Sequence, residues 1–325
     1  MSYSIAIPHQ SEKAFWNATS KNAGLIFDRF IPDLREKSDS KKDGLIKVKE
    51  AFDRRDIELF KAWRKRWILT AQAAGAHPFK LKTEWRLIAG LGRKGMLEVG
   101  FTFHRYGFPY LPGSSIKGLA RMYALLEIAK SLGGDKFKNE EESKEKDAPL
   151  TKLEHALSED EEGKFEKAFG AFLPNHDARE MAQAFRLIFG TTNNAGKAVF
   201  FDAVPSETCA LNLDIMNPHY PDYYKEGSKE PPTNWQSPIP VYFLAVSSGS
   251  DFHFAIGWRK PEEDQKFKAV ETQQPWSWFK GERLAQQAPT NAFQIQKLAR
   301  RWLQGGLLDL GIGGKTSAGY GYFKE

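Results

Sequence analysis

The stretch PTNAFQIQKLARRWLQGGLLDLGIGGKTSAGYGYF, Pro289 to Phe323, holds three successive patterns that decide the fold. Apolar residues such as Ile295 and Trp302 recur at helical spacing in its first part and predict an amphipathic helix. Five glycines from Gly311 to Gly321 then predict a loop. Tyr320 to Phe323 alternates like a short strand. We therefore expect the chain to end as a helix, a glycine-rich loop and a strand.

Gly-Lys-Thr at positions 314 to 316 raises the question of a nucleotide-binding loop. A Walker A loop needs a further glycine five residues earlier, where this chain has Asp309, and it lies between a strand and a following helix. Here the helix comes first and the strand last. The dinucleotide fingerprint fails as well, because Thr316 stands where its third glycine belongs. These mismatches argue against a mononucleotide site.

Two interpretations of the loop remain. Successive backbone N–H groups in a glycine-rich loop can form an anion-binding concavity, and Lys315, Thr316 and Ser317 would add one cation and two hydroxyls. Such a group suits the phosphates and sugars of a nucleic acid strand. The alternative is a tight turn that only packs on the neighbouring sheet, and the residues alone support both equally.

A second motif, LPGSSIKGLAR, begins at Leu111 and opens another predicted helix. Ser114 and Ser115 can cap this helix, contact RNA, or do both. Lys117 and Arg121 are four residues apart, so they share one helix face away from the apolar stripe. This arrangement would offer N–H donors and two cations to a phosphate.

Charge is unevenly distributed along the chain, although the net charge is only +6. Lys61 to Arg121 contains twelve Lys or Arg residues and two Glu, a net charge of +10, which indicates a polyanion partner. The alternative is a solvated basic face. Asp135 to Lys167 contains twelve acidic and seven basic residues and few aromatics, so we expect a surface insertion that is not part of the core.

The remaining patterns predict an α+β fold with a ferredoxin-like, RRM-like core. Residues 1–76 show helical spacing and predict a helical N-terminal extension. Residues 79–105 and 239–260 each resemble a β-hairpin. We expect residues 77–325 to form the core domain, with the charged insertion at about residues 135–180.

Composition excludes several classes of protein. Cys209 is the only cysteine, so neither an internal disulfide nor a thiolate zinc cluster is possible. The histidines are scattered singly, and we expect no metal and no cofactor. No apolar stretch approaches the length of a membrane span or a signal peptide, which predicts a cytoplasmic protein without a membrane partner.

Together these motifs resemble a known family. LPGSSIKGLAR paired with the terminal GIGGKTSAGYGYF resembles the RAMP proteins of CRISPR systems, whose hallmark is a glycine-rich loop before the last strand. The resemblance is narrower still, to the family of the sixth subunit of the Cmr complex. It rests on the order of the motifs and on two further segments, FGTTNNAGKAVFFDAVP and LDIMNPHYPDYY. It covers about residues 79 to 325.

The resemblance implies a non-catalytic RNA-binding structural subunit of a type III-B effector, which acts in antiviral defence. It implies that the chain binds guide RNA toward the 3′ end and caps the complex, with other RAMP subunits as partners and target RNA contacted indirectly. The residues that it places near guide RNA are Pro112, Gly113, Ser114, Ser115, Lys117, Arg121, Gly311, Gly313, Gly314, Lys315, Thr316, Ser317 and Gly319.

The alternative is a metal-independent endoribonuclease, because RAMP relatives include enzymes that process or cut RNA. Asp214, His219, Tyr220 and Asp222 cluster in sequence and could supply acid and base groups. A loop rich in Tyr and Pro also suits a subunit contact, and we favour that interpretation. The residues expected at this contact are His219, Tyr220, Tyr223 and Tyr224.

Overall fold

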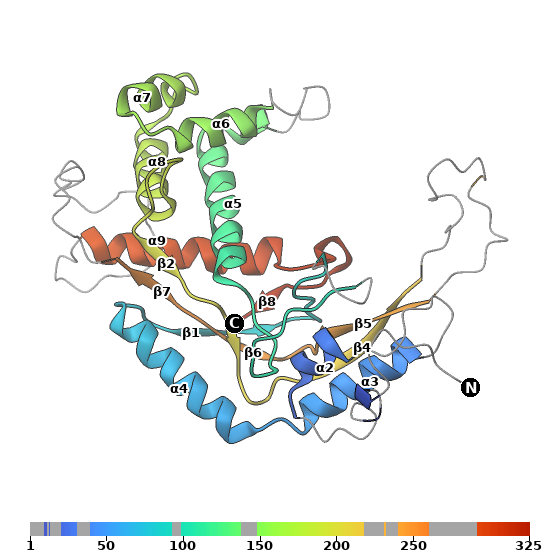
Figure 1. Ribbon diagram of the computed structural model, residues 1–325. Coiled ribbons are helices and arrows are strands. Elements are labelled where there is room, and N and C mark those ends of the chain that lie inside the picture. The colour runs from blue at the N-terminus through green and yellow to red at the C-terminus, as the bar shows by residue number, and fades with distance from the viewer. Residues whose placement is uncertain are drawn as a thin grey trace.

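A computed structural model gives the architecture of the protein (Figure 1). It describes residues 21–30, 40–92, 99–137, 148–217, 240–259 and 291–325, with residues 10, 11, 13 and 231 as isolated positions. The described residues of the N-terminal part are mainly helical, as predicted, with α2 Ala23–Arg29, α3 Ser40–Asp53 and α4 Ile57–Ala73. Their buried side chains, including Phe52 and Trp67, belong to the same hydrophobic core as the sheet.

Four short strands form the central antiparallel sheet. They are β1 Phe79–Thr83, β3 Val204–Pro205, β6 Asp251–Phe254 and β8 Phe323–Lys324. Their order is β3-β6-β1-β8, and every neighbouring pair is antiparallel. Helix α5, Gly113–Ser131, connects β1 to the β3 side of the sheet, and α9, Asn291–Gly305, leads from the β6 side to β8. The predicted final helix, loop and strand are therefore present.

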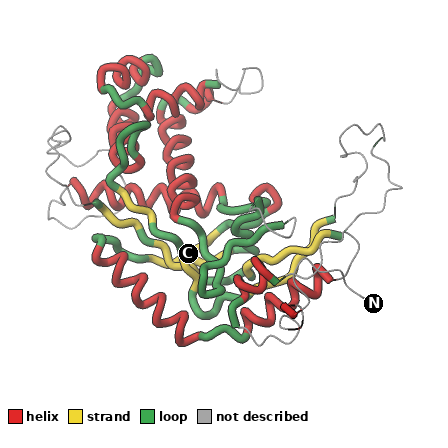
Figure 2. The backbone as a smooth tube through the Cα atoms, viewed as in Figure 1, coloured by secondary structure: helices red, strands yellow, loops and turns green. Residues whose placement is uncertain are grey.

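Helices α4 and α9 cover opposite faces of this sheet. On one face, Trp67 of α4 lies edge-on to His253 of β6, with ring centroids 6.5 Å apart. On the other, the Arg300 guanidinium of α9 lies 4.3 Å from the centroid of the Phe79 ring of β1. Helix α5 packs on α9 through Tyr123 and Leu119, where Gly305 and Gly306 leave room for their side chains. Helix α5 thus lies on the α9 side (Figure 2).

Two further strands form a separate two-stranded sheet next to β3 and β6. Strand β2, Ala198–Phe200, pairs with β7, Ile256–Trp258. Phe200 faces Ile256, whereas Val204 of β3 faces His253 of β6, so the register shifts by one residue between the two pairs. Such a bulge redirects a side chain. Here it lies at residues 201–203, directly beside the start of α5.

The hairpin predicted over residues 239–260 is wrong. Strand β5, Val241–Val246, pairs with β4, Leu211–Met216, while β6 pairs with β1 and β3. Thr83 provides the physical reason, because this fully buried residue fixes the connection between β5 and β6. Its hydroxyl donates to the Ser247 carbonyl at 3.0 Å and accepts from the Ser250 N–H at 2.9 Å. The connection therefore turns against β1 instead of closing a hairpin.

The hairpin predicted over residues 79–105 is only partly present. Its first half forms β1, but β1 pairs with β6 and β8. The backbone after it does approach residues 99–102, with Thr102 N–H donating to Ala89 O at 2.8 Å and Gly100 N–H donating to Leu91 O at 3.2 Å. No strand is assigned among the described residues of this second half, residues 99–105.

The acidic insertion contributes to the core, contrary to prediction. After the short turn η1, Gly134–Phe137, it forms α6, Pro149–Ser158, and α7, Glu162–Gly170, and leads into α8, His176–Phe189. Leu153, Leu157 and Phe169 are fully buried in the main hydrophobic core. The Glu and Lys residues occupy the outward faces of these helices. The charge count therefore hid the buried apolar residues, which recur every four positions.

The end of α9 leads directly into the glycine-rich loop. A π-helical turn, η4 Gly306–Leu310, follows α9, and a short 3-10 turn, η5 Thr316–Ala318, lies within the loop. Gly305 allows Tyr123 of α5 to approach α9 closely, since a Cβ there would lie 2.2 Å from the Tyr123 ring. None of the described helices is long and apolar enough to cross a bilayer.

Candidate nucleic-acid interface

The first turn of α5 is held by the bulge in the neighbouring strands. A Cβ on Gly113 would lie 2.3 Å from the Phe200 carbonyl oxygen, so only glycine fits there. Asp202, at the bulge, accepts a hydrogen bond from the Gly113 N–H at 2.7 Å. Asp202 therefore supplies, from a neighbouring strand, an acceptor for an N–H at the start of the helix. The carboxylate also compensates the positive end of the helix dipole.

The sequence suggests that Ser114 and Ser115 cap α5, but in the structure they do not. Pro112 occupies the N-cap position, and no side chain caps the helix from that position. Both serines are exposed, so their hydroxyls face solvent at the start of the helix. The alternative of contact with RNA stays a prediction for these two residues.

Arg121 has a structural role that sequence spacing did not reveal. Its guanidinium forms an ion pair with Glu154 of α6, donates to Ser158 Oγ at 3.0 Å and lies 5.1 Å from the centroid of the Phe185 ring of α8. Arg121 therefore ties α5 to the helical insertion. Its charge is largely compensated, so it is less suited to a phosphate than Lys117.

Lys117 is half-buried among cations. Burial lowers its pKa, and the positive charges of Arg121 and Arg259 lower the pKa further. No ion-pair partner of Lys117 or of the exposed Arg259 occurs in the part of the chain that the structure describes. Arg259 directly follows β7 and was not singled out in the sequence; a basic residue at the end of a β-rich run was its only signal. An anion would relieve the repulsion between these charges.

The inner half of the glycine-rich loop packs against the chain itself. A Cβ on Gly313 would lie 2.2 Å from Ile88 O, and one on Gly321 would lie 2.0 Å from Ile312 O. Gly314 N–H donates to Ile88 O, and Gly321 N–H donates to Arg86 O. The close approach that glycine allows is thus made to residues 86–88 and to Ile312. These contacts agree with the interpretation of this half as a packed turn, and contact with RNA stays a prediction for Gly313 and Gly314.

The outer half of the loop has amides without an acceptor among the described residues. Lys315 has the left-handed conformation, with φ of 61°, and is followed by the turn η5. No hydrogen bond of the described residues uses the N–H of Lys315, Thr316 or Ser317. A left-handed residue before helical residues aligns successive N–H groups in this way. Ser317 and Gly319 are exposed, and a Cβ on Gly319 would meet no atom within 4 Å.

Lys315 points its side chain toward the paired strands β4 and β5. Its ammonium lies 3.4 Å from Met216 Sδ and 5.4 Å from the centroid of the Phe243 ring. Beside it, Asp214 accepts a hydrogen bond from the Tyr320 hydroxyl at 2.7 Å and forms an ion pair with Arg86. The loop is therefore fastened to β4 by polar groups that are far apart in sequence.

This arrangement bears on the catalytic alternative. Burial alone would raise the pKa of Asp214, but the hydrogen bonds from Arg86 and Tyr320 outweigh burial and hold the pKa below its ordinary value. A carboxylate so stabilised is a weak base. His219, Tyr220 and Asp222, its proposed companions, lie outside the described residues, as do Tyr223 and Tyr224 of the predicted partner contact.

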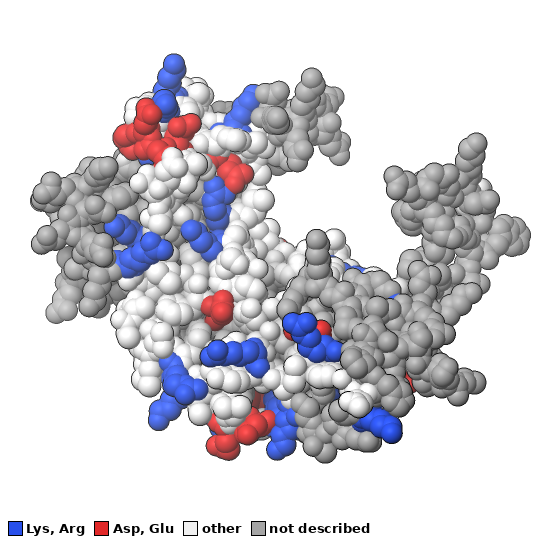
Figure 3. All heavy atoms as spheres, in the orientation of Figure 1, with Lys and Arg blue, Asp and Glu red and all other residues white. Residues whose placement is uncertain are grey.

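The basic stretch Lys61 to Arg121 does not form one surface. Its α4 part lies on one side of the sheet and its α5 part on the other, so these charges cannot all face the same strand of RNA. On the face shown in Figure 3, Lys and Arg form separate groups, and acidic side chains gather at the α7 end. For binding a phosphate, the charges close to Lys117 matter more than the net charge of the whole stretch.

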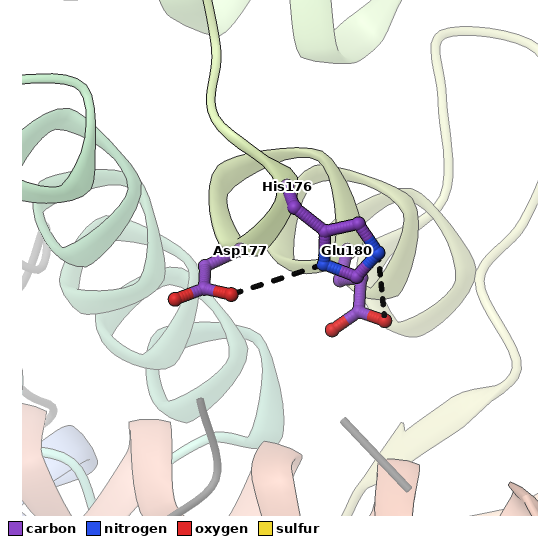
Figure 4. Close-up of side chains that lie close together, drawn as sticks. All are labelled: His176, Asp177 and Glu180. Carbon is purple, nitrogen blue, oxygen red and sulfur yellow. Dashed lines mark ion pairs between the residues drawn. The ribbon is translucent and has the colours of Figure 1, made fainter. Parts of the chain in front are cut away.

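One cluster has the composition of a metal site. His176, Asp177 and Glu180, at the start of α8, have potential ligand atoms within 4.8 Å of one another (Figure 4). However, the two carboxylates approach different ring nitrogens, Nδ1 and Nε2, each at 3.9 Å. A single ion can use only one of these nitrogens. Acidic residues are also favoured in the first turn of a helix, so we assign no metal here.

The comparisons with known proteins identify the class to which this architecture belongs. The family model of the RAMP superfamily matches residues 79–324, which span the sheet, α5 and the glycine-rich loop. The chain therefore belongs to the RAMP superfamily.

Within that superfamily, the chain is similar to the CRISPR system Cmr subunit Cmr6 of Pyrococcus furiosus. The two are 32% identical over 318 residues, which cover 94% of this chain and 82% of the relative. The predicted resemblance to the sixth Cmr subunit is confirmed.

Two solved structures are also similar to the chain. The crystal structure of Cmr6 from Pyrococcus furiosus has 28% identity and a TM-score of 0.37, over 77% of this chain and 97% of that one. A chain of the type III-B Cmr-beta complex bound to cognate target RNA has 18% identity and a TM-score of 0.49, over 96% of this chain and 84% of that one.

Proposed function

We propose that this protein is an RNA-binding, non-catalytic subunit of a type III-B CRISPR effector. In this role it binds guide RNA toward the 3′ end, caps the complex beside other RAMP subunits and meets target RNA only through the guide. Its homology to a Cmr subunit supports the assembly, and antiviral defence in the cytoplasm follows from that assignment.

The observation that carries the RNA-binding proposal is the outer half of the glycine-rich loop. Three successive amides, from Lys315 to Ser317, have no acceptor among the described residues, and two side-chain hydroxyls stand beside them. Backbone amides and hydroxyls contact phosphate and sugar without reading sequence. Such contacts fit a subunit that holds a guide whose sequence varies.

The group of Lys117 and Arg259 is the second support. These cations lie near each other without a carboxylate partner among the described residues. Repulsion between them disfavours the free protein and is removed when a phosphate enters, so part of the binding energy comes from relief of that repulsion.

The topology supports a ferredoxin-like core for this proposal. The strand order β3-β6-β1-β8, with α5 and α9 as the two crossing helices, is the order expected of a β-α-β-β-α-β unit. Because α4 covers part of the sheet face opposite α9, RNA is expected at the loop and at α5 instead of on the sheet.

Fluorescence anisotropy with labelled guide RNA tests the proposal. Lys117→Glu should weaken binding about tenfold and lower the slope of log affinity against log salt by about one. Lys130→Glu is the matched control, because Lys130 is exposed near the other end of the same helix. Equal losses for the two variants, or an unchanged salt slope, would contradict a specific phosphate contact at Lys117.

The same preparation tests the absence of catalysis. Guide-repeat RNA incubated with the chain in the absence of divalent metal should stay intact. Cleavage that His219→Ala abolishes would establish the endoribonuclease instead.

A further inference from the structure

A cavity of about 310 Å³ lies on the α9 side of the sheet, away from the glycine-rich loop. It occupies the place where β1 begins, β7 begins and α9 passes over both. Its lining is formed by His77, Phe79, Ile256, Gln296, Lys297 and Arg300. No acidic residue is among these six, and neither the loop nor Lys117 contributes to it.

The floor of this cavity is apolar and rigid. Phe79 and Ile256 are each 7% exposed, and the Phe79 ring stacks on Phe254 of β6 with centroids 5.6 Å apart. Because both floor residues sit on paired strands, the floor is preformed. Volumes of this size accommodate a small organic ligand with an aromatic ring.

The rim of the cavity is cationic. Arg300 is exposed and holds its guanidinium over the Phe79 ring, with a planar surface turned away from the floor. His77 is exposed as well and lies just before β1. An arginine plane can stack on a nucleobase, and its N–H groups can donate to a phosphate. The site therefore combines an apolar floor with positive charge at its mouth.

We propose that this cavity receives a nucleotide, with the base stacked on the outward plane of the Arg300 guanidinium, whose inner plane already covers Phe79, and with the phosphate at the cationic rim. The nucleotide can belong to a single-stranded RNA or be free in solution, since the chemistry recognised is the same. The first case rests on the proposed function, because it makes the cavity an additional contact for the bound RNA.

Titrations with adenosine 5′-monophosphate and with a labelled short oligoadenylate test the cavity and distinguish the two sources. Arg300→Ala should weaken binding about tenfold. Arg301→Ala is the matched control on the same helix, since Arg301 faces Glu127 of α5 and does not line the cavity. An effect on both ligands indicates that the nucleotide itself is recognised, and an effect on the oligoadenylate alone indicates a strand.

A second variant tests base insertion separately from charge. Gln296→Trp fills the cavity and leaves Arg300 and His77 in place, so it should weaken binding about as much as Arg300→Ala. Unchanged binding in both variants would overturn the proposal. The same holds if Arg300→Ala leaves nucleotide binding intact but weakens assembly with partner subunits, because the cavity would then be a protein contact.

The outcome can be separated from that of the proposed function. If Lys117→Glu weakens oligoadenylate binding and Arg300→Ala does not, the cavity proposal fails alone. If wild-type chain binds adenosine monophosphate in an Arg300-dependent way but no RNA, the cavity stands and the proposed function fails.

Discussion

The glycine-rich loop and the first turn of α5 look alike in sequence, since both combine small residues with a cation, yet they differ in what their amides do. At α5, the carboxylate of Asp202 already accepts from the Gly113 N–H. At the loop, the amides of Lys315 and of the next two residues have no acceptor in the described part of the chain. Small residues at a helix start or a turn thus create N–H donors, but contacts from elsewhere in the chain decide which donors stay open to a ligand.

The strongest way to break this comparison is to substitute the glycines of the loop. Gly321→Ala should lower the free energy of unfolding by about 3 kcal/mol, because its φ is +79° and a Cβ would lie 2.0 Å from Ile312 O. Gly319→Ala, at φ +86° in open space, should cost only about 1 kcal/mol. Urea denaturation measures both. Equal costs would show that the inner half of the loop is not packed as described.

The pH dependence of stability tests the buried core, which is distinct from the glycine-rich loop and from the first turn of α5. Burial, and then the positive charges of Lys80 and Arg64, lower the pKa of His253 to about 4, although Glu207 and Asp251 act the other way. The folded protein therefore binds this proton less readily than the unfolded chain. Stability from His253 is complete above its ordinary pKa and is lost as the pH falls from about 6.5 toward 4, on the order of 2 kcal/mol.

His253→Gln is the variant that checks this dependence. Thermal unfolding followed from pH 7 to pH 4 should show a shallower decline in the variant than in the wild type. If stability fell equally with pH in the variant and the wild type, protonation of His253 would not be the cause of the loss of stability.

The smallest expected effect concerns the cap of α5. Asp202→Asn keeps an acceptor for the Gly113 N–H but removes the charge, so the free energy of unfolding should fall by about 1 kcal/mol or less. Guide RNA should bind as well or more tightly, because a negative charge at the start of α5 is gone. A loss of affinity in anisotropy measurements would place Asp202 among the groups that recognise RNA.

Local sequence patterns predicted the C-terminal elements and helix α5, but little of how the strands pair. The final helix, loop and strand, and helix α5, follow from spacing and glycine content within one segment. The partner of β5 depends on Thr83, which bonds to Ser247 across 164 residues of chain, and no local pattern records such a bond. The burial of the insertion's helices was missed because their charged outer faces dominate the composition.

The same limit applies to the candidate site. Sequence spacing put Lys117 and Arg121 on one face of α5, but only the fold shows that Glu154 and Ser158 engage Arg121. The fold likewise brings Arg259 near enough for its charge to lower the pKa of Lys117, after burial and Arg121. Sequence therefore indicated which segments to consider, and tertiary contacts decided which of their groups stay available.

The π-helical turn Gly306–Leu310 takes up one residue more than an α turn, and the Gly311 N–H accordingly donates to the carbonyl of Gly306, five residues earlier. This one turn absorbs its extra residue, so the helix before it and the loop after it keep their relative orientation. In the α-helical part of α9, by contrast, each residue rotates the chain by about 100°, and an insertion or deletion there would turn everything after it. Gly313 would then no longer meet Ile88, so a change in the length of α9 is far more disruptive than a change of side chain.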